Sequence, residues 1–304
     1  MNEITPATSD GYYFHGDYGK YYELLSVAID TTPGMDSSAG TTGAAASLRP
    51  RTKVGRTDNM DKYKTLFYPE SSFGGFTDID GTIAFYCRVN ALLKPPFVAV
   101  DFGCGRGGHQ EDPVVFRRNL RSLKGKVAKV IGVDVDEIGQ TNPTLDEFRF
   151  LAPGRAWPLE DQSADLVTCD CVLEHLPDPL TFFQEAKRVL VQGGYLCIRT
   201  PNAHSYVGIG SRLVPNRHHG WVLSRAQLGR KEEDVFPTLY KCNTISALRR
   251  LFSRSHFRAA VYGYAPEPSY LSFSKLAYAV GVAHQKLAPG FLRPTILAFG
   301  QSGR

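Results

Sequence analysis

From about residue 61 onward, hydrophobic residues occur in two alternating patterns. In the first, short apolar runs rich in β-branched and aromatic residues are typical of strands buried in a sheet. Seven segments show this pattern: FVAVDF at 97–102, VAKVIGVDV at 127–135, EFRFL at 147–151, ADLVTCD at 164–170, YLCIRT at 195–200, FRAAVYGY at 257–264 and TILAFG at 295–300. We predict one strand in each segment.

In the second pattern, apolar residues recur at the spacing of a helix, and polar residues stand where such helices would begin. Asp80 precedes one such segment. Asp112–Pro113 and Asp178–Pro179 each combine an N-cap residue with a proline suited to the first helical position. A further helix is predicted over about 243–253. Because strands and helices alternate, we predict an α/β fold with a Rossmann-like, doubly wound parallel sheet.

The first 60 residues differ in composition from the rest of the chain. Residues 31–60 are rich in Gly, Ser, Thr and Ala, which is typical of a linker or a disordered segment. We therefore predict a largely flexible N-terminal extension over 1–60 and one domain over 61–304. No signal peptide is recognisable, and no uncharged apolar stretch reaches the roughly 18 residues of a membrane span. We expect a cytoplasmic protein without a membrane span.

Composition and charge exclude several classes of protein. A hydrophobic content of 42% and a charged content of 21% over 304 residues are typical of a globular domain. The net charge of +5 is small and its basic residues are scattered, which disfavours nucleic-acid binding. The six cysteines include no C-x-x-C pair, so they are expected to be core residues in a reducing compartment rather than disulfides or zinc ligands.

A glycine-rich loop follows the first predicted strand in the segment VAVDFGCGRGGH. Gly103, Gly105 and Gly108 satisfy G-x-G-x-x-G, which holds a pyrophosphate in dinucleotide enzymes. Asp101 would repel a pyrophosphate but suits a ligand with an ammonium or sulfonium group. Asp134, at the end of the second strand, is placed to accept hydrogen bonds from ribose hydroxyls. Together they favour a cationic, ribose-bearing ligand; the alternative is that each acid only stabilises a turn.

Downstream motifs add a family resemblance. Five motifs occur in order: D-F-G-C-G-R-G at 101–107, G-V-D-V-D at 132–136, A-W-P-L-E-D-Q-S-A-D-L-V at 156–167, V-L-E-H-L-P-D-P at 172–179 and E-A-K-R-V-L-V-Q-G-G at 185–194. This set resembles the class I S-adenosylmethionine-dependent methyltransferases, in particular the bacterial branch that includes ubiquinone/menaquinone-type methyltransferases. The resemblance covers about residues 95–202, the predicted core. It implies a seven-stranded sheet with an antiparallel last strand, and S-adenosylmethionine as cofactor.

The resemblance also implies which residues bind the cofactor. By motif match these are Asp101, Phe102, Gly103, Cys104 and Gly105 on the methionine side, Asp134 at the ribose, Val135, Ala156 and Trp157 at the adenine, and Asp170 and Cys171 near the sulfonium. Two features depart from the family. No acid follows the third strand to hold the adenine amino group. The interval from Asp101 to Asp134 exceeds the roughly 20 residues usual between such a loop and its acid, which implies a longer first helix or loop.

The resemblance implies methyl transfer by in-line displacement, in which the protein chiefly aligns the acceptor with the methyl group. A carbon or oxygen acceptor also needs a proton removed, most often by a histidine or a carboxylate. His175, in the L-E-H-L motif, is the first candidate for this base, and Asp170 is the second. The alternative for His175 is a structural role.

A metal site is a further alternative. C-V-L-E-H followed by a later R-H-H resembles the layout of metal-assisted methyltransferases, including small-RNA 2′-O-methyltransferases. Glu174, His175 and His218 or His219 would then offer oxygen and nitrogen ligands to a divalent ion. However, Cys171 stands where those enzymes have their first glutamate. We therefore predict no metal.

Residues 203–292 are predicted to be helical and aromatic additions on the acceptor side. Their aromatic residues suit an apolar-lined acceptor pocket: Tyr206, Trp221, Phe236, Tyr240, Tyr262, Tyr264, Tyr270, Phe273 and Tyr278. T-P-N-x-x-S-Y resembles bacterial methyltransferases of saccharide or cell-envelope synthesis. We expect O-methylation of a small-molecule or saccharide acceptor by a monomer or homodimer. The alternatives are an NAD(P)-dependent Rossmann oxidoreductase and a non-catalytic S-adenosylmethionine-binding protein.

Overall fold

The structure, a computed structural model, describes residues 62–213 and 238–303. The predictions for residues 1–60, for His218 and His219, and for the acceptor-side aromatics Trp221 and Phe236 lie outside the described residues. Within the described part, no helix combines the length and apolar character needed to cross a membrane.

A seven-stranded sheet forms the centre of the domain. Its strands are β1 (Val98–Phe102), β2 (Lys129–Asp134), β3 (Glu147–Phe150), β4 (Ala164–Asp170), β5 (Leu190–Pro201), β6 (Phe257–Tyr264) and β7 (Thr295–Ser302). They lie in the order β3-β2-β1-β4-β5-β7-β6. β7 is antiparallel to both of its neighbours, whereas the other pairings are parallel. The predicted fold class is confirmed.

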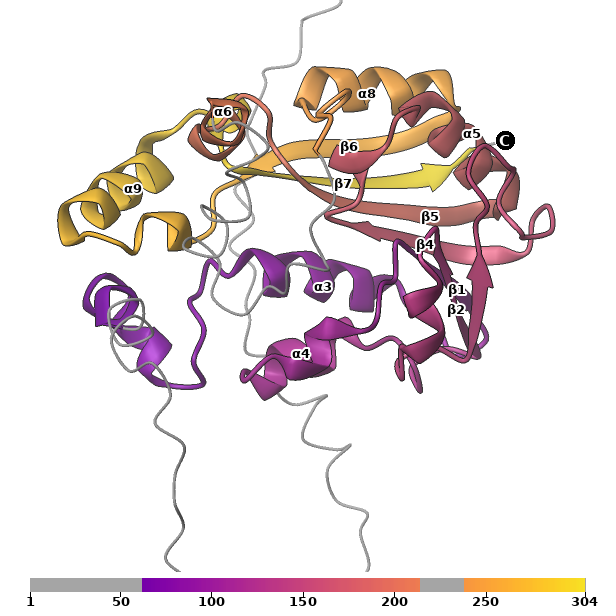
Figure 1. Cartoon of the computed structure of the whole chain (residues 1–304), viewed down its shortest axis with the longest axis horizontal. Coiled ribbons are helices and arrows are strands. Elements are labelled where there is room, and N and C mark those ends of the chain that lie inside the picture. Colours follow the sequence, from indigo (N-terminus) through magenta and orange to yellow (C-terminus); the bar gives the residue numbers. More distant parts are fainter. Residues whose placement is uncertain (1–61, 214–237, 304) are drawn as a thin grey trace, which may run out of the picture. The chain divides into compact units, whose positions relative to one another are not determined.

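Helices cover both faces of the sheet (Figure 1). They are α3 (Gly81–Leu92), α4 (Val115–Arg121), α5 (Pro179–Val189), α6 (Tyr206–Leu213), α8 (Ile245–Arg254) and α9 (Lys275–Leu287). α5 and α8 lie on one face, and α3 and α4 lie on the other. Each face has its own apolar cluster, because alternate residues of a strand point to opposite sides. The additions α6 and α9 fall within the predicted range 203–292.

The helix starts follow local capping chemistry in two of three predicted cases. Asp80 accepts hydrogen bonds from the second and third residues of α3, and Asp178 does the same for α5. The prediction that Asp112 caps the next helix is wrong: α4 has Val114 at its N-cap position. The carboxylate of Asp112 bonds instead to the backbone N–H of Val114 and to Arg117.

The fifth strand is longer than predicted. β5 begins at Leu190, directly after α5, and pairs there with Ala164 of β4. Gly193 therefore lies inside the strand, with a φ of 82°. A left-handed backbone at this point accompanies the irregular pairing with β4 and is accessible to glycine.

Six strands end at the same edge of the sheet. β7 is antiparallel to β5 and to β6, so β6 runs in the same direction as β1–β5. We call this edge the carboxyl edge. The first turn of α3 lies there, because Thr82 Oγ1 accepts a hydrogen bond from Arg199 near the end of β5. Ligands of open α/β sheets bind outside this edge, which positions the candidate site.

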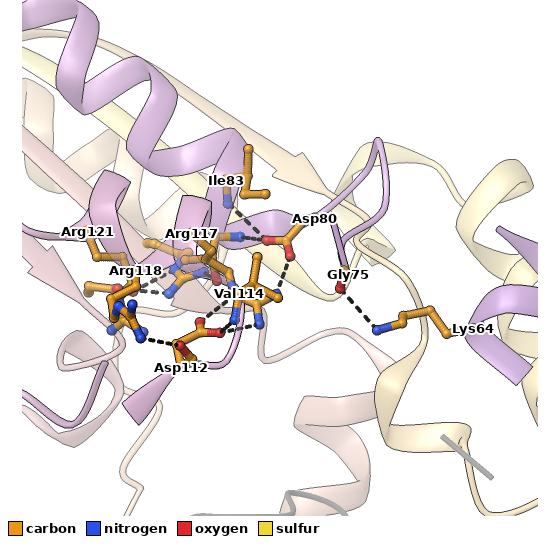
Figure 2. Close-up of polar contacts among 12 residues, drawn as sticks. Lys64, Gly75, Asp80, Ile83, Asp112, Val114, Arg117, Arg118 and Arg121 are labelled. Atoms are coloured by element: carbon orange, nitrogen blue, oxygen red, sulfur yellow. Dashed lines mark hydrogen bonds and ion pairs between the residues drawn. The ribbon is translucent and has the colours of Figure 1, made fainter. Parts of the chain in front are cut away.

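An arginine joins the starts of α3 and α4 (Figure 2). Arg117 donates from Nη1 to Asp80 Oδ2 at 2.6 Å, and from Nε and Nη2 to the two oxygens of Asp112 at 2.5 and 2.8 Å. Paired two-point contacts of this kind fix orientation as well as distance. The first turn of α3 is therefore held against α4, beside the glycine loop.

Candidate functional site

The glycine loop and the end of β2 are held together by a carboxylate. Asp134 Oδ2 accepts a hydrogen bond from the backbone N–H of Gly105 at 2.8 Å, and Asp134 Oδ1 accepts one from Asp136 at 3.0 Å. Each oxygen keeps a further acceptor position. Asp134 therefore both shapes the loop and presents acceptor capacity at the carboxyl edge.

Two glycines of the loop have left-handed backbones but different surroundings. Gly103 has a φ of 74°, and a Cβ at this position would lie 2.2 Å from a methyl carbon of Val172. Gly105 has a φ of 48°, and a Cβ there would meet nothing within 4 Å. Gly103 is thus required by packing inside the protein. Gly105 faces open space, as expected of a backbone that a ligand approaches closely.

Asp101 lies at the end of β1 in a buried setting. Thr168 Oγ1, on β4, donates a hydrogen bond to Asp101 Oδ1 at 3.0 Å. Burial raises the pKa of Asp101 to about 6; the bond from Thr168 opposes this effect, and the nearby Asp170 carboxylate adds to it. At neutral pH Asp101 is therefore mostly ionised and readily stabilised by a positive charge.

Asp170, at the end of β4, is the centre of a buried polar network. Arg199 donates to its two oxygens at 2.6 and 2.8 Å, and Tyr86 donates to Oδ2 at 3.0 Å. Arg121 lies 3.6 Å from the same oxygen. Burial would raise the pKa of Asp170, but the charges of Arg199 and Arg121 hold it at about 2. A carboxylate held so acidic is a weak base at neutral pH, so Asp170 is better suited to positioning than to proton removal.

Two nitrogen atoms next to this network have no hydrogen-bond partner among the described residues. They are His109 Nε2 and Arg121 Nε, both buried. Burial lowers the pKa of His109 to about 4, with a contribution from Arg121, so the imidazole is neutral at pH 7. Arg121 and Asp101 also line one small hollow of about 10 Å³. The half-buried guanidinium of Arg121 thus lies close enough to the Asp101 carboxylate to lower its pKa, near the glycine loop.

The residues assigned to the adenine are divided between core and surface. Val135 is half exposed, and Ala156 is exposed. Trp157 is 5% exposed and stacks on Phe102, with ring centroids 4.4 Å apart. Phe102 and Trp157 therefore form part of the core beneath α5, and Val135 offers apolar surface at the carboxyl edge.

Glu174 and His175 lie in a short 3₁₀ turn after β4 (Leu173–His175). Glu174 is 5% exposed, and its Oε2 accepts a hydrogen bond from Thr200 at 3.0 Å. Asn243 donates to the same Thr200 hydroxyl at 2.6 Å. His175 Nε2 lies 3.9 Å from Glu174 Oε1. In the described part of the chain, no three His, Cys, Asp or Glu residues gather as metal ligands would.

The sequence interpretation missed four members of the site, one of which is His109, just after the glycine loop. Arg199 carries a signal, because an arginine inside a buried strand requires a partner. Tyr86 gave no such signal in the sequence, because its position matches the helical spacing of the apolar residues of α3. Arg121 is one of several arginines in its segment. Only the packing of α4 against the sheet shows that it is the one that lies next to Asp170. The long interval between Asp101 and Asp134 proves to be loop and 3₁₀ turn, since α4 has only seven residues.

Known proteins resemble this chain over the same region. Residues 100–198 match a family model described as methyltransferase domain. A ubiquinone biosynthesis O-methyltransferase of Xanthomonas axonopodis pv. citri is 30% identical over 199 residues, covering 59% of this chain and 80% of that protein. A trans-aconitate 2-methyltransferase of Variovorax paradoxus is 30% identical over 106 residues, covering 34% of this chain and 38% of that protein.

Coverage of other relatives is partial. The match spans 31% to 54% of the length of the first curated relatives, so the chain corresponds to about a third to a half of those proteins. Among solved structures, a SAM-dependent methyltransferase of Archaeoglobus fulgidus aligns with a TM-score of 0.45 and 17% identity, covering 79% of this chain and 99% of that one.

Proposed function

Because the chain belongs to the class I S-adenosylmethionine-dependent methyltransferases, we propose that it methylates a hydroxyl oxygen of a small-molecule or saccharide acceptor. The observation that carries the proposal is the arrangement of Asp101, Gly105 and Asp134 at the carboxyl edge. Similarity to a protein named as an O-methyltransferase supports oxygen as the acceptor atom. The nicotinamide alternative loses its support, since the glycine loop belongs to a methyltransferase domain.

The residues present fit S-adenosylmethionine, which supplies an activated methyl group when bound. Gly105 leaves open space at the loop, and the Asp134 oxygens each keep an acceptor position for ribose hydroxyls. The methionine end carries both an ammonium and a carboxylate. We assign the ammonium to Asp101 and the carboxylate to Arg121 and His109, whose unpartnered nitrogens are donors suited to it.

Within this proposal, Val135 lies beside the adenine, and Trp157 with Phe102 supports that side of the site from the core. Cys171, with a φ of 58°, continues the chain from Asp170 toward the methyl group. His175 is the proposed base that removes the hydroxyl proton. Asp170 holds Arg199 and Tyr86 in place, and it is not assigned the proton because its pKa is too low.

Labelled methyl transfer tests the proposed function. The full chain is incubated with methyl-labelled S-adenosylmethionine and small-molecule extract of its source cells, and the labelled product is identified by mass spectrometry. We expect a methyl ether. A product methylated on nitrogen or carbon would overturn the assignment to oxygen. Failure to bind S-adenosylhomocysteine at millimolar concentration would overturn the cofactor assignment. Tight binding without any transfer would favour the non-catalytic alternative.

Removing Arg121 tests how the methionine end is held. Arg121→Ala should weaken binding of S-adenosylhomocysteine about tenfold, the effect of losing one charge-assisted hydrogen bond. Binding of 5′-methylthioadenosine, which lacks the amino-acid end, should be unchanged, as measured by titration calorimetry. Arg118→Ala, on the same helix, is the matched control. Equal weakening of both ligands by Arg121→Ala would contradict the assignment.

A further inference from the structure

A group of polar aromatic residues lies beside the carboxyl edge, outside the residues assigned above. Tyr68 and Tyr278 are 8% and 1% exposed, with ring centroids 6.5 Å apart. Tyr206, at the start of α6, makes an edge contact with His284 of α9 at 5.2 Å. Glu267 lies close enough to raise the pKa of both Tyr68 and Tyr278, although burial is the larger cause. We call these five residues the tyrosine cluster. They come from four separate segments of the chain.

Three polar atoms of the cluster are buried without a hydrogen-bond partner among the described residues. They are the hydroxyl oxygens of Tyr68 and Tyr278 and the Nδ1 atom of His284. A buried polar atom without a partner destabilises the fold, and native proteins have few of them. Three in one cluster on the ligand-binding side of a sheet indicate a site whose partners come from a ligand.

The charge of the cluster limits which ligand fits. Glu267 Oε2 accepts a hydrogen bond from Thr77 at 3.0 Å. Burial raises the pKa of Glu267 to about 7, and the nearby Asp80 carboxylate adds to the effect. Arg117, the basic group that opposes it, is already paired with Asp80 and Asp112. An anionic ligand would therefore meet carboxylates, whereas uncharged hydroxyl groups would meet neutral donors and acceptors.

A short run of contacts joins the cluster to the end of β4. Thr77 and Asp80 lie directly before α3 (Figure 2 shows Asp80 at this helix start). Thr82, in the first turn, accepts a hydrogen bond from Arg199, and Arg199 pairs with Asp170. The tyrosine cluster and Asp170 thus flank the same turn of α3. This places the cluster on the side from which an acceptor approaches a methyl group near Asp170.

We infer that the tyrosine cluster is the acceptor site and that it binds an uncharged ring bearing hydroxyl groups. Tyr68, Tyr278 and His284 hydrogen-bond to those hydroxyls. This inference rests on the proposed methyl transfer. One acceptor hydroxyl oxygen forms the new C–O bond as the S–CH₃ bond breaks. The electron pair stays on sulfur, and the hydroxyl proton passes to the base. We expect a polycarboxylate such as trans-aconitate to bind more weakly than such a ring.

Direct binding to the protein loaded with S-adenosylhomocysteine tests the inference. The probes are catechol, methyl glucoside and trans-aconitate, at millimolar concentration. Binding of catechol is expected from a phenolic acceptor and binding of methyl glucoside from a saccharide acceptor. Either result supports the inference if Tyr68→Phe and Tyr278→Phe weaken it about tenfold, the effect of one lost hydrogen bond. Tyr195→Phe, in β5, is the control and should leave the binding of both hydroxylated probes unchanged.

Two further measurements distinguish a ligand-binding role of Tyr68 and Tyr278 from a structural one. Tyr68→Phe and Tyr278→Phe should leave the free protein as stable as before or more stable, because each removes an unpartnered hydroxyl. Their affinity for S-adenosylhomocysteine should be unchanged. Tighter binding of trans-aconitate than of both other probes, or no binding of either hydroxylated ring, would overturn the inference while the methyltransferase assignment stands. Loss of S-adenosylhomocysteine binding in the unmodified protein would instead overturn the proposed function.

Discussion

Replacing Arg199 by alanine should destabilise the protein by about 3–5 kcal/mol, the usual effect of removing one partner of a buried ion pair and leaving the other charge uncompensated. Arg199 is 12% and Asp170 7% exposed, and Arg199 satisfies both oxygens of that carboxylate. In the variant, Asp170 keeps its contacts with the hydroxyl of Tyr86, the side chain of Cys171 and the more distant Arg121. The pKa of Asp170 should rise from about 2, so part of the loss is recovered at acid pH, where the carboxylate takes up a proton.

Urea unfolding of three variants measures this effect. Arg258→Ala, at an exposed position on β6, is the matched control and should change the free energy of unfolding by less than about 0.5 kcal/mol. Asp170→Asn combined with Arg199→Ala should be more stable than Arg199→Ala alone, because no uncompensated charge remains. If Arg199→Ala matched the Arg258→Ala control, the network around Asp170 would not support the carboxyl edge as described.

Local sequence was sufficient for most of the fold because the inner strands β1, β2 and β4 are largely buried. A continuous apolar run such as that of β1 is then the expected signature, and the helix caps Asp80 and Asp178 follow from short-range chemistry. Asp112 has the same local pattern but bonds to Arg117, which itself reaches Asp80, 37 residues away. A contact of that range cannot be predicted from the segment alone. The antiparallel direction of the last strand came from the family resemblance and not from the periodicity, and its position between β5 and β6 was not predicted.

The site was predictable where strand ends determine it and not where side chains pack between elements. Asp101 and Asp134 follow directly from two neighbouring parallel strands, whose ends must lie together. Tyr86 and Arg121 come from helices, and their meeting at Asp170 depends on how α3 and α4 pack on the sheet. The tyrosine cluster is a still longer-range feature, since Tyr68 and Tyr278 are 210 residues apart yet touch through their rings. The aromatic content of the acceptor side was visible in the sequence, but its unpartnered hydroxyls were not.

Gly105→Ala should reduce the affinity for S-adenosylhomocysteine roughly hundredfold, or by about 2.7 kcal/mol, while the protein stays folded. Gly105 has a φ of 48°, and a methyl group there would meet no protein atom within 4 Å. The added methyl therefore fills the open space at the loop rather than the core. Gly125→Ala is a close control, because Gly125 also has a positive φ, 81°, and also faces open space. Both variants should lose about 1 kcal/mol of stability from the left-handed backbone.

Three glycine variants should differ in which quantity they change: cofactor affinity, stability or both. Of the three, Gly105→Ala is expected to have the largest effect on affinity relative to its effect on stability. Gly103→Ala is expected to lose stability as well as affinity, because its Cβ would lie 2.2 Å from a methyl carbon of Val172. Gly125→Ala should lose the same small stability as Gly105→Ala and no affinity. Calorimetric titration with S-adenosylhomocysteine and thermal unfolding separate the two quantities. Equal affinities for Gly105→Ala and Gly125→Ala would mean that the cofactor does not approach the loop at Gly105. The role assigned to Asp134 would then have to be abandoned as well, because Asp134 is positioned through its bond to the Gly105 amide.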